Sequence, residues 1–279
     1  MGKLLVVDGS NLLFQMFFGM PARILGRDGT PIQGVVGFLG ALRKLVKMVS
    51  PTHLLVLFDG EHHNPRCDLD CTYKANRPDF SALPDEENPF TQLPHIQRAL
   101  AYLGIPTYET VDCETDDIIA SYAKGCPDGM EVIISSFDSD FFQLISPSVK
   151  VIRYRGEQSV IWDEVTLKEK LGVTPKQYAD YKAMVGDHAD NISGIPGVGP
   201  KTAVKLLTQY GSLDGIYSHI AELRERQKET LLAHKERIPH NLALIVLDGS
   251  HPLPIPYESL AYTYPPLGTR DVLMALGVM

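Results

Sequence analysis

Short apolar runs alternate with longer amphipathic stretches through the first half of the chain. Three runs have the length and composition of buried strands: Lys3–Val7, His53–Phe58 and Val132–Ser135. Apolar residues recur at helical spacing in Val35–Val49, with basic residues on the opposite face. Further helices are expected at Gln97–Leu103 and Ile118–Ala123. The alternation predicts an α/β fold with a mostly parallel central sheet flanked by helices.

The second half begins with a predicted antiparallel hairpin and then turns helical. Val149–Tyr154 and Ser159–Trp162 are expected to pair at one edge of the sheet. The helices predicted after them are Leu167–Leu171, Pro175–Val185, Lys201–Tyr210 and Ile220–His234. We therefore place a boundary near residue 165, between an α/β domain of residues 1–164 and a helical subdomain of residues 165–279.

The segment of residues 64–94 has the least core-like composition in the chain. It holds five prolines, several acids and few apolar residues. Loops of this length within compact domains are usually functional or mobile. We expect a mobile, functional segment at this position.

Acidic residues follow the predicted strands or open the predicted helices at five places. They are Asp8, Asp59, Glu114, Asp116, Asp117, Asp138, Asp140, Asp187 and Asp190. The carboxyl ends of parallel strands form the ligand-binding edge of such a sheet. Because unpaired buried charges are expensive, a shared cluster of carboxylates needs cations. Hard ions such as Mg²⁺, or Mn²⁺, prefer oxygen ligands of this kind.

The spacing of these acids favours a common site over isolated roles. Asp138 and Asp140 are two residues apart and share one face of an extended segment. Glu114 and Asp117, like Asp187 and Asp190, are three apart and share a helical face. A single such acid is as readily explained by helix capping or solvation. Two cations about 4 Å apart can clamp a scissile phosphate, so the set predicts a two-metal phosphodiesterase.

Overall charge neither supports nor excludes a nucleic-acid partner. The 279 residues carry a net charge of −8, from 34 acidic and 26 basic residues. Once the nine candidate ligands are set aside, the remaining charges nearly balance. No apolar run approaches the length of a membrane span, and the four cysteines form no paired framework. We expect a cytoplasmic protein with no membrane association.

Two further motifs have the features of phosphate-binding elements. In GIPGVGPKTAVKLL, residues 194–207, glycines precede a helix that opens at Pro200. This is either a tight turn between helices or a helix-hairpin-helix, at residues 185–210, that binds a DNA backbone. The second motif is Tyr73-Lys74-Ala75-Asn76-Arg77, with Arg66 upstream. One helical turn would aim Lys74 and Arg77 at one phosphate, and Tyr73 could stack on a base. Its alternative is a solvated basic face.

The motifs VDGSN, FDG, YKANRP, ETDD, DSD and GDHADNISGIPGVGPKTA occur in this order over residues 3–250. In this respect the chain resembles the 5′-nuclease superfamily of flap endonucleases and 5′–3′ exonucleases, and especially the N-terminal nuclease domain of bacterial DNA polymerase I. The resemblance implies a structure-specific nuclease, a monomer acting on 5′-flap, nicked or branched DNA. It also implies that residues 64–94 form a helical arch.

The resemblance assigns roles to individual residues. Asp8, Asp59, Glu114, Asp116 and Asp138 match the neighbourhood of a first metal, and Asp117, Asp140, Asp187 and Asp190 that of a second. Lys74 and Arg77 match arch residues at the scissile phosphate. The hairpin residues expected to contact DNA are Gly197, Val198, Gly199, Lys201 and Thr202, and Ile195 and Val198 match a K⁺ site.

Two departures and two alternative functions accompany this resemblance. Phe137 stands where a small residue is familiar before DSD, and Thr115 where alanine is common. One alternative is a non-catalytic protein that binds branched DNA. The other is a ribonuclease built on a related acid-cluster fold. Metal-dependent cleavage of a 5′-flap duplex distinguishes the first alternative from the nuclease.

Overall fold

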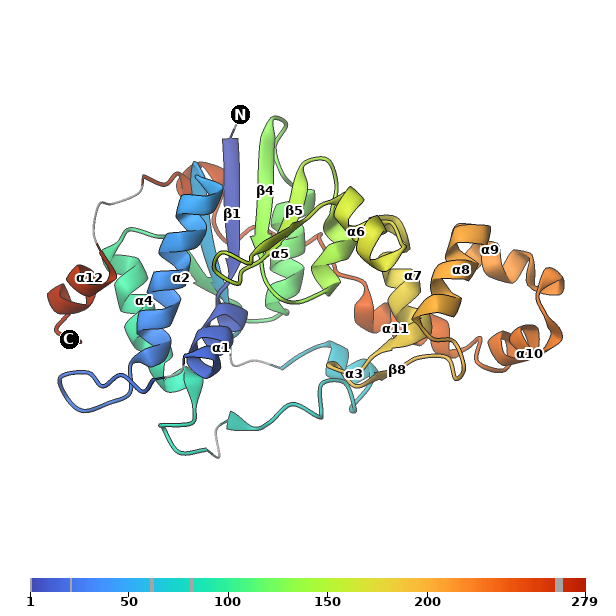
Figure 1. Cartoon of the computed structure of the whole chain (residues 1–279), viewed down its shortest axis with the longest axis horizontal. Coiled ribbons are helices and arrows are strands. Elements are labelled where there is room, and N and C mark those ends of the chain that lie inside the picture. Colours follow the sequence, from blue (N-terminus) through green and yellow to red (C-terminus); the bar gives the residue numbers. More distant parts are fainter. Residues whose placement is uncertain (1, 21, 61–62, 81–82, 264–267) are drawn as a thin grey trace.

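A central six-stranded sheet organises the N-terminal part of the protein (Figure 1). The computed structural model describes residues 2–20, 22–60, 63–80, 83–263 and 268–279. The strands are β1 (Gly2–Asp8), β2 (His53–Phe58), β3 (Thr107–Glu109), β4 (Met130–Ser135), β5 (Val149–Arg153) and β6 (Val160–Trp162). Their order is β3-β2-β1-β4-β5-β6, with β6 antiparallel to β5 and the other pairs parallel. The predicted α/β fold and edge hairpin are confirmed.

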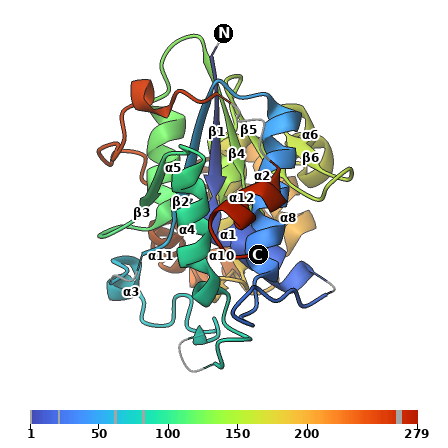
Figure 2. The ribbon, with the colours of Figure 1, turned by 90° about the vertical axis from the view of Figure 1, so that its left-hand side faces the viewer.

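Helices cover both faces of the sheet because successive strand residues point to opposite sides. Leu5 and Val7 of β1 join one apolar cluster, and Leu4 and Val6 join another. The first face is covered by α1 (Gly9–Gly19), α2 (Gln33–Val49), α4 (Leu93–Tyr102) and α12 (Thr269–Ala275). Figure 2 shows this layer in front of the strands. The second face is covered by α5 (Thr115–Lys124) and by the helical part of the chain.

The helical part forms the far end of the elongated molecule (Figure 1). It comprises α6 (Glu164–Leu171), α7 (Pro175–Val185), α8 (Pro200–Tyr210), α9 (Leu213–Ser218), α10 (Glu225–Ala233) and α11 (Arg237–Ile245), with a short ribbon of β7 (Gly186–Asp187) and β8 (Ile192–Ser193). The helix predicted at Ile220–His234 is interrupted. Leu223 has an extended backbone and packs against the core, and α10 begins after Arg224. Among the described helices, none is both long and apolar enough to cross a membrane.

Residues 64–94 are mostly turns in the part that the structure describes, which leaves out 81–82. A four-residue helix, α3 (Arg66–Leu69), and a 3₁₀ turn at Pro89–Gln92 lie there, and α4 begins at Leu93. Phe80 and Phe90 pack edge-on against Phe14 of α1, at centroid distances of 5.0 and 5.3 Å. The segment therefore rests on α1 through aromatic contacts.

After α11 the chain returns to the α/β domain and packs against it. The predicted helical subdomain of residues 165–279 instead included this last segment. The Tyr257 hydroxyl donates a hydrogen bond to the Tyr122 carbonyl at 2.6 Å. The Tyr262 N–H donates to the Thr52 carbonyl at 2.9 Å, and α12 packs against α2 and α4. Apolar residues of α12 (Val272 and Leu273) complete the core over these helices, which explains the return.

Gly60, directly after β2 and Asp59, sits where the backbone of residue 110 approaches most closely. A Cβ atom at Gly60 would lie 1.8 Å from the Thr110 carbonyl oxygen. Its N–H also donates to the Thr110 hydroxyl at 3.3 Å. A side chain at this position must therefore displace the connection that follows β3.

We expect Gly60→Ala to lower the free energy of unfolding by about 1–3 kcal/mol, as overpacking typically does. Urea unfolding followed by circular dichroism measures the change. The control is Gly40→Ala in α2, where the added methyl group meets open space. That change should raise stability by roughly 0.5–1 kcal/mol because alanine favours the helix. Equal stability of both variants would contradict the proposed clash.

Candidate active site at the carboxyl edge of the sheet

A cavity of about 1180 Å³ opens at the carboxyl ends of β1, β2 and β4. Five of the predicted ligands line it: Asp8, Asp59, Glu114, Asp116 and Asp138. Lys74 and Arg77 lie on its wall, together with Phe14, Phe80 and Phe90. The structure thus brings together acids from four separate segments of the sequence. It places the two basic side chains, Lys74 and Arg77, beside them.

Asp8 ends β1 and also caps α1. Its carboxylate accepts hydrogen bonds from the Asn11 N–H at 2.9 Å and the Ser136 hydroxyl at 2.8 Å. The Ser136 oxygen in turn accepts from the Asp138 N–H at 3.0 Å. Gly9, Ser10 and Asn11 form the first turn of α1. These bonds fix Asp8 and Asp138 relative to each other across β1 and β4.

The acids that line the cavity repel one another strongly. Burial, followed by the Asp59 charge, raises the pKa of Asp8 from 3.8 to about 7. Burial and the Asp138 charge raise the pKa of Asp116 well above its ordinary value. Lys74 and Arg66 instead lower the pKa of Glu114, against the effect of its burial. Two carboxylates that resist ionisation beside further acids have the electrostatic character of a cation site. Its donors are all oxygens, which suits a hard divalent ion.

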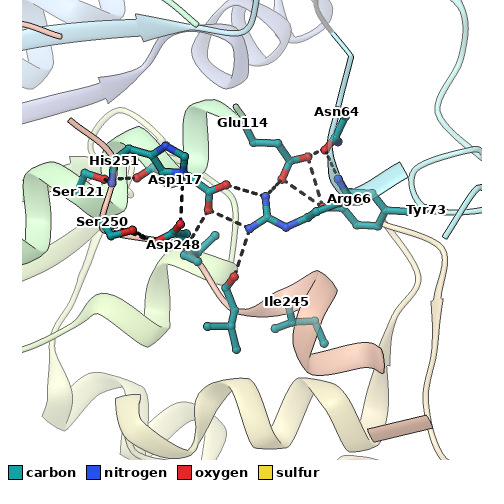
Figure 3. Close-up of polar contacts among 12 residues, drawn as sticks. Asn64, Arg66, Tyr73, Glu114, Asp117, Ser121, Ile245, Asp248, Ser250 and His251 are labelled. Atoms are coloured by element: carbon teal, nitrogen blue, oxygen red, sulfur yellow. Dashed lines mark hydrogen bonds and ion pairs between the residues drawn. The ribbon is translucent and has the colours of Figure 1, made fainter. Parts of the chain in front are cut away.

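Arg66 holds both Glu114, which lines the cavity, and Asp117 (Figure 3). The Arg66 guanidinium donates to Glu114 at 2.5 Å and to both oxygens of Asp117 at 2.8 Å. It also donates to the Val246 carbonyl at 3.2 Å, and Asp117 accepts from the Asp248 N–H at 2.8 Å. Arg66 therefore connects residues 64–94 to α5 and to the loop that follows α11.

Two residues predicted to contact DNA are placed in the interior. Arg66 is 8% exposed and its guanidinium is used within the protein, so in this arrangement it presents no group to a phosphate. Tyr73 is 4% exposed and its hydroxyl lies 3.4 Å from both Glu114 oxygens, which leaves no free ring face for a base. Both side chains support Glu114 instead. Asp117, engaged by Arg66, likewise lies behind the cavity.

Lys74 and Arg77 come from a turn rather than a helix, and each pairs with an acid of the site. The Lys74 ammonium donates to Glu114 at 2.5 Å and lies 4.8 Å from the Tyr73 ring centroid. Arg77 donates to Asp190 at 2.8 Å. The Lys74 N–H also donates to the Asp190 carbonyl at 3.0 Å. This turn therefore contacts both Glu114, which lines the cavity, and Asp190, which belongs to a second group of acids described next.

Asp140, Asp187 and Asp190 form a second group, in which one carboxylate oxygen of each lies within 4.8 Å of the others. Lys182 of α7 is buried between Asp140 and Asp187 and bonds to both. Burial alone would lower the pKa of Lys182, but the two carboxylates raise it, so the ammonium stays charged. Lys182 was not among the site residues predicted from the sequence. The signal available was one lysine within the apolar stretch that precedes Gly186-Asp187.

The predicted hairpin connects the β7–β8 ribbon to α8. Gly197 has a positive φ of 76°, and the Val198 N–H closes the turn on the Ile195 carbonyl at 3.0 Å. Gly199 caps α8, and added Cβ atoms at Gly197 and Gly199 would meet open space. The Ile195 and Val198 side chains are buried, Lys201 is exposed and Thr202 is half-buried. The backbone of the turn is accessible to a ligand.

Two protein-family models together match residues 3–266 of this chain. Residues 3–172 match the 5′-3′ exonuclease N-terminal resolvase-like domain, and residues 173–266 match the 5′-3′ exonuclease C-terminal SAM fold. DNA polymerase I of Rhizobium leguminosarum is 38% identical over 92% of this chain, which spans 26% of that protein. A 5′-3′ exonuclease of Aquifex aeolicus is 34% identical, covering 96% of this chain and 89% of its own length.

Solved structures share the fold at lower identity. The T5 5′-exonuclease with bound zinc superposes with a TM-score of 0.71 at 24% identity, covering 88% of this chain and 90% of that one. The catalytic core of Rad2 in complex with DNA substrate gives 0.60 at 16% identity, covering 98% and 86%. This chain spans about a quarter to a third of the DNA polymerase I relatives that it matches.

The raised pKa of Asp8 generates a pH-dependent prediction. Between pH 4 and 7 the folded protein holds a proton on Asp8 that the unfolded chain has lost, so stability falls as pH rises through this range. At pH 8 the buried Asp8 charge lowers the free energy of unfolding by on the order of 4 kcal/mol. In EDTA, Asp8→Asn should therefore unfold at higher urea concentration than the wild type at pH 8. At pH 4 the difference should vanish.

Addition of Mg²⁺ at pH 8 should narrow or reverse this difference, because only the wild type retains the full carboxylate set. The same stability difference at pH 4 and pH 8 would show that the Asp8 charge is not buried at a cost.

Proposed function

This chain belongs to the 5′-3′ exonuclease family, and from that premise we propose that it hydrolyses phosphodiester bonds in DNA at 5′ ends and 5′ flaps. The observation that carries the proposal is the cavity in which five carboxylates meet Lys74 and Arg77. Asp8 and Asp116, which resist ionisation beside other acids, favour divalent cations at this place, and the two basic residues favour an anionic substrate. A phosphodiester that binds together with divalent cations would satisfy both.

The proposed cofactors are two Mg²⁺ or Mn²⁺ ions. The carboxylates lining the cavity would hold the first, and Asp140, Asp187 and Asp190 would hold the second. When bound, such ions would act as Lewis acids that activate water and stabilise the leaving oxygen. The protein's own contribution is to fix the carboxylates: Ser136 orients Asp8, and Arg66 and Asn64 orient Glu114.

Lys74 and Arg77 are the groups proposed to contact the scissile phosphate. Both lie on the cavity wall, and in the protein alone each is neutralised by an acid, Glu114 or Asp190. Both side chains would have to leave these carboxylates to reach the phosphate. Positive groups aimed at developing charge lower the barrier to hydrolysis.

The hairpin is proposed to hold the DNA backbone away from the cleavage point. Support comes from the open space around Gly197 and Gly199, the N-terminus of α8 and the exposed Lys201. Such contacts carry no base preference. A K⁺ ion at Ile195 and Val198 would have to bind main-chain carbonyls, because both side chains are apolar and buried.

The proposed substrate is 5′-flap, nicked or branched duplex DNA, bound by a monomer. We also propose a cytoplasmic location. All four cysteines are free thiols, as expected in a reducing compartment.

The test is cleavage of duplexes that carry a 5′ or a 3′ flap, each labelled on either end. We expect Mg²⁺- or Mn²⁺-dependent cleavage of the 5′ flap, little cleavage of the 3′ flap, and no activity in EDTA. Asp138→Asn should slow cleavage by on the order of a hundredfold or more, as loss of one charge-stabilising group does. Asp214→Asn, in the first turn of α9 and outside the cavity, serves as the control. Cleavage that persists in EDTA would refute the metal-dependent mechanism, and DNA binding without cleavage would favour the non-catalytic alternative.

A second prediction concerns the hairpin. Gly199 has φ −88° and open surroundings, so Gly199→Val should fold. The side chain would keep a phosphate from the backbone and weaken duplex binding by roughly tenfold or more, equivalent to one charge-assisted hydrogen bond. Fluorescence anisotropy on duplexes of two unrelated sequences measures this, with Gly40→Val as control. Unchanged affinity for both duplexes would mean that the segment is only a turn.

A further inference from the structure

Two arginines at the far end of β5 have no part in the site described so far. Arg153 is the last residue of β5 and Arg155 follows it in the turn toward β6. Because β5 runs parallel to β4, with Ile152 opposite Ser135, both arginines lie at the same edge of the sheet as Asp138. Among the described residues, neither forms an ion pair within 4 Å. They differ in this from Arg66 and Arg77, whose guanidinium groups are paired with acids.

Aromatic rings hold Arg153 instead. Its guanidinium carbon lies 4.7 Å from the centroid of the Phe142 ring and 5.4 Å from that of Trp162. These two rings stack at 4.4 Å, and Tyr178 of α7 packs edge-on against Phe142 at 5.5 Å. Phe142, Trp162 and Tyr178 thus form an aromatic platform. It connects the edge of the sheet to α7, the helix that precedes the hairpin.

The position of Arg153 is costly unless a further partner completes it. Its Nε is buried without a hydrogen-bond partner among the described residues. Burial lowers the pKa of Arg153, and the neighbouring Tyr178 and Asp138 groups only partly offset this. A half-buried guanidinium whose N–H lacks a hydrogen-bond partner gains more binding free energy from an anion than a fully solvated guanidinium does.

Arg155 extends the same basic surface. It is exposed, and its guanidinium carbon lies 5.2 Å from the ring centroid of Phe137. Phe137 directly precedes Asp138, and its N–H donates to the Asn11 side chain at 3.0 Å. The large residue that replaces a familiar small one before DSD thus provides the ring on which Arg155 rests. This ring places a second cation beside the cavity.

We propose that Arg153 and Arg155 form an additional phosphate-binding site, which takes a backbone phosphate of the DNA between the catalytic cavity and the hairpin. The inference rests on the proposed function, since it assumes a DNA substrate. Stacking on Phe142, Trp162 and Phe137 restricts each guanidinium to a plane. A planar donor held in advance loses little freedom when it binds a phosphate.

The experiment measures how duplex affinity depends on salt, because each phosphate contact contributes to that dependence. A nicked duplex with a fluorescent label is titrated in EDTA at several KCl concentrations. Loss of each contact should flatten the plot of log affinity against log salt by about 0.9. We expect a slope smaller by about 0.9 in Arg155→Gln, and by up to about twice that in Arg153→Gln/Arg155→Gln.

The control is Lys150→Gln, which removes one positive charge from the same strand. Lys150 pairs with Glu131 at 2.6 Å, three residues before Arg153 and nearer the opposite edge of the sheet. Its salt slope should equal that of the wild type. Equal slopes in folded Arg155→Gln, the double variant and the wild type would overturn the proposal. Arg155 is exposed, so its single variant is informative even if loss of Arg153 disturbs the platform.

Cleavage of the 5′ flap by the wild type with Mg²⁺ is measured in parallel, and it separates the two ideas. A wild type that binds DNA with a steep slope but cleaves nothing would refute the proposed function alone. A wild type that cleaves, together with variants of unchanged slope, would refute the arginine site alone.

Discussion

Buried carboxylates gathered at one edge of the sheet are the constraint on which the rest of the structure depends. Asp8 and Asp116 resist ionisation because they are buried beside other acids. Buried basic side chains compensate the negative charge of neighbouring acids, and Arg66 and Lys182 are the most enclosed of the paired basic side chains described. Each of these cations contacts two acids, and removal of either would leave buried charge uncompensated. The fold is therefore arranged to bring basic side chains from distant segments to this edge.

Arg66 illustrates how this charge balance also organises the tertiary structure. Its contacts join the base of the segment 64–94 to α5 and to the Val246 carbonyl. Nearby, Gln143 bonds to both sides of residue 246, donating to Ile245 and accepting from Leu247. The helical part and the α/β domain thus meet where the acids are neutralised. The site and the junction between the two parts are stabilised by the same side chains.

Local patterns were enough to predict the strands and the acids behind them, because an apolar run and the residue that ends it are neighbours in sequence. They could not predict partners that come from far away. Arg66 and Tyr73 are read from sequence as exposed basic and aromatic residues, yet contacts with Glu114 bury both. Lys182 was missed because its partner Asp140 lies on another element. The break at Leu223 and the return of α12 likewise depend on tertiary packing that helical periodicity does not encode.

The Arg66–Val246 hydrogen bond spans 180 residues of chain. Bringing such distant groups together carries a loop-closure entropy that only many simultaneous contacts can offset. Contacts of this kind form late and slow the folding of a domain. During synthesis, the β-sheet strands leave the ribosome long before residue 246 does. Glu114 can acquire its contacts with Asn64, Arg66 and Lys74 early, because these residues precede it in the chain. The hydrogen bond that ties Arg66 to the segment after α11 forms only once residue 246 has been synthesised.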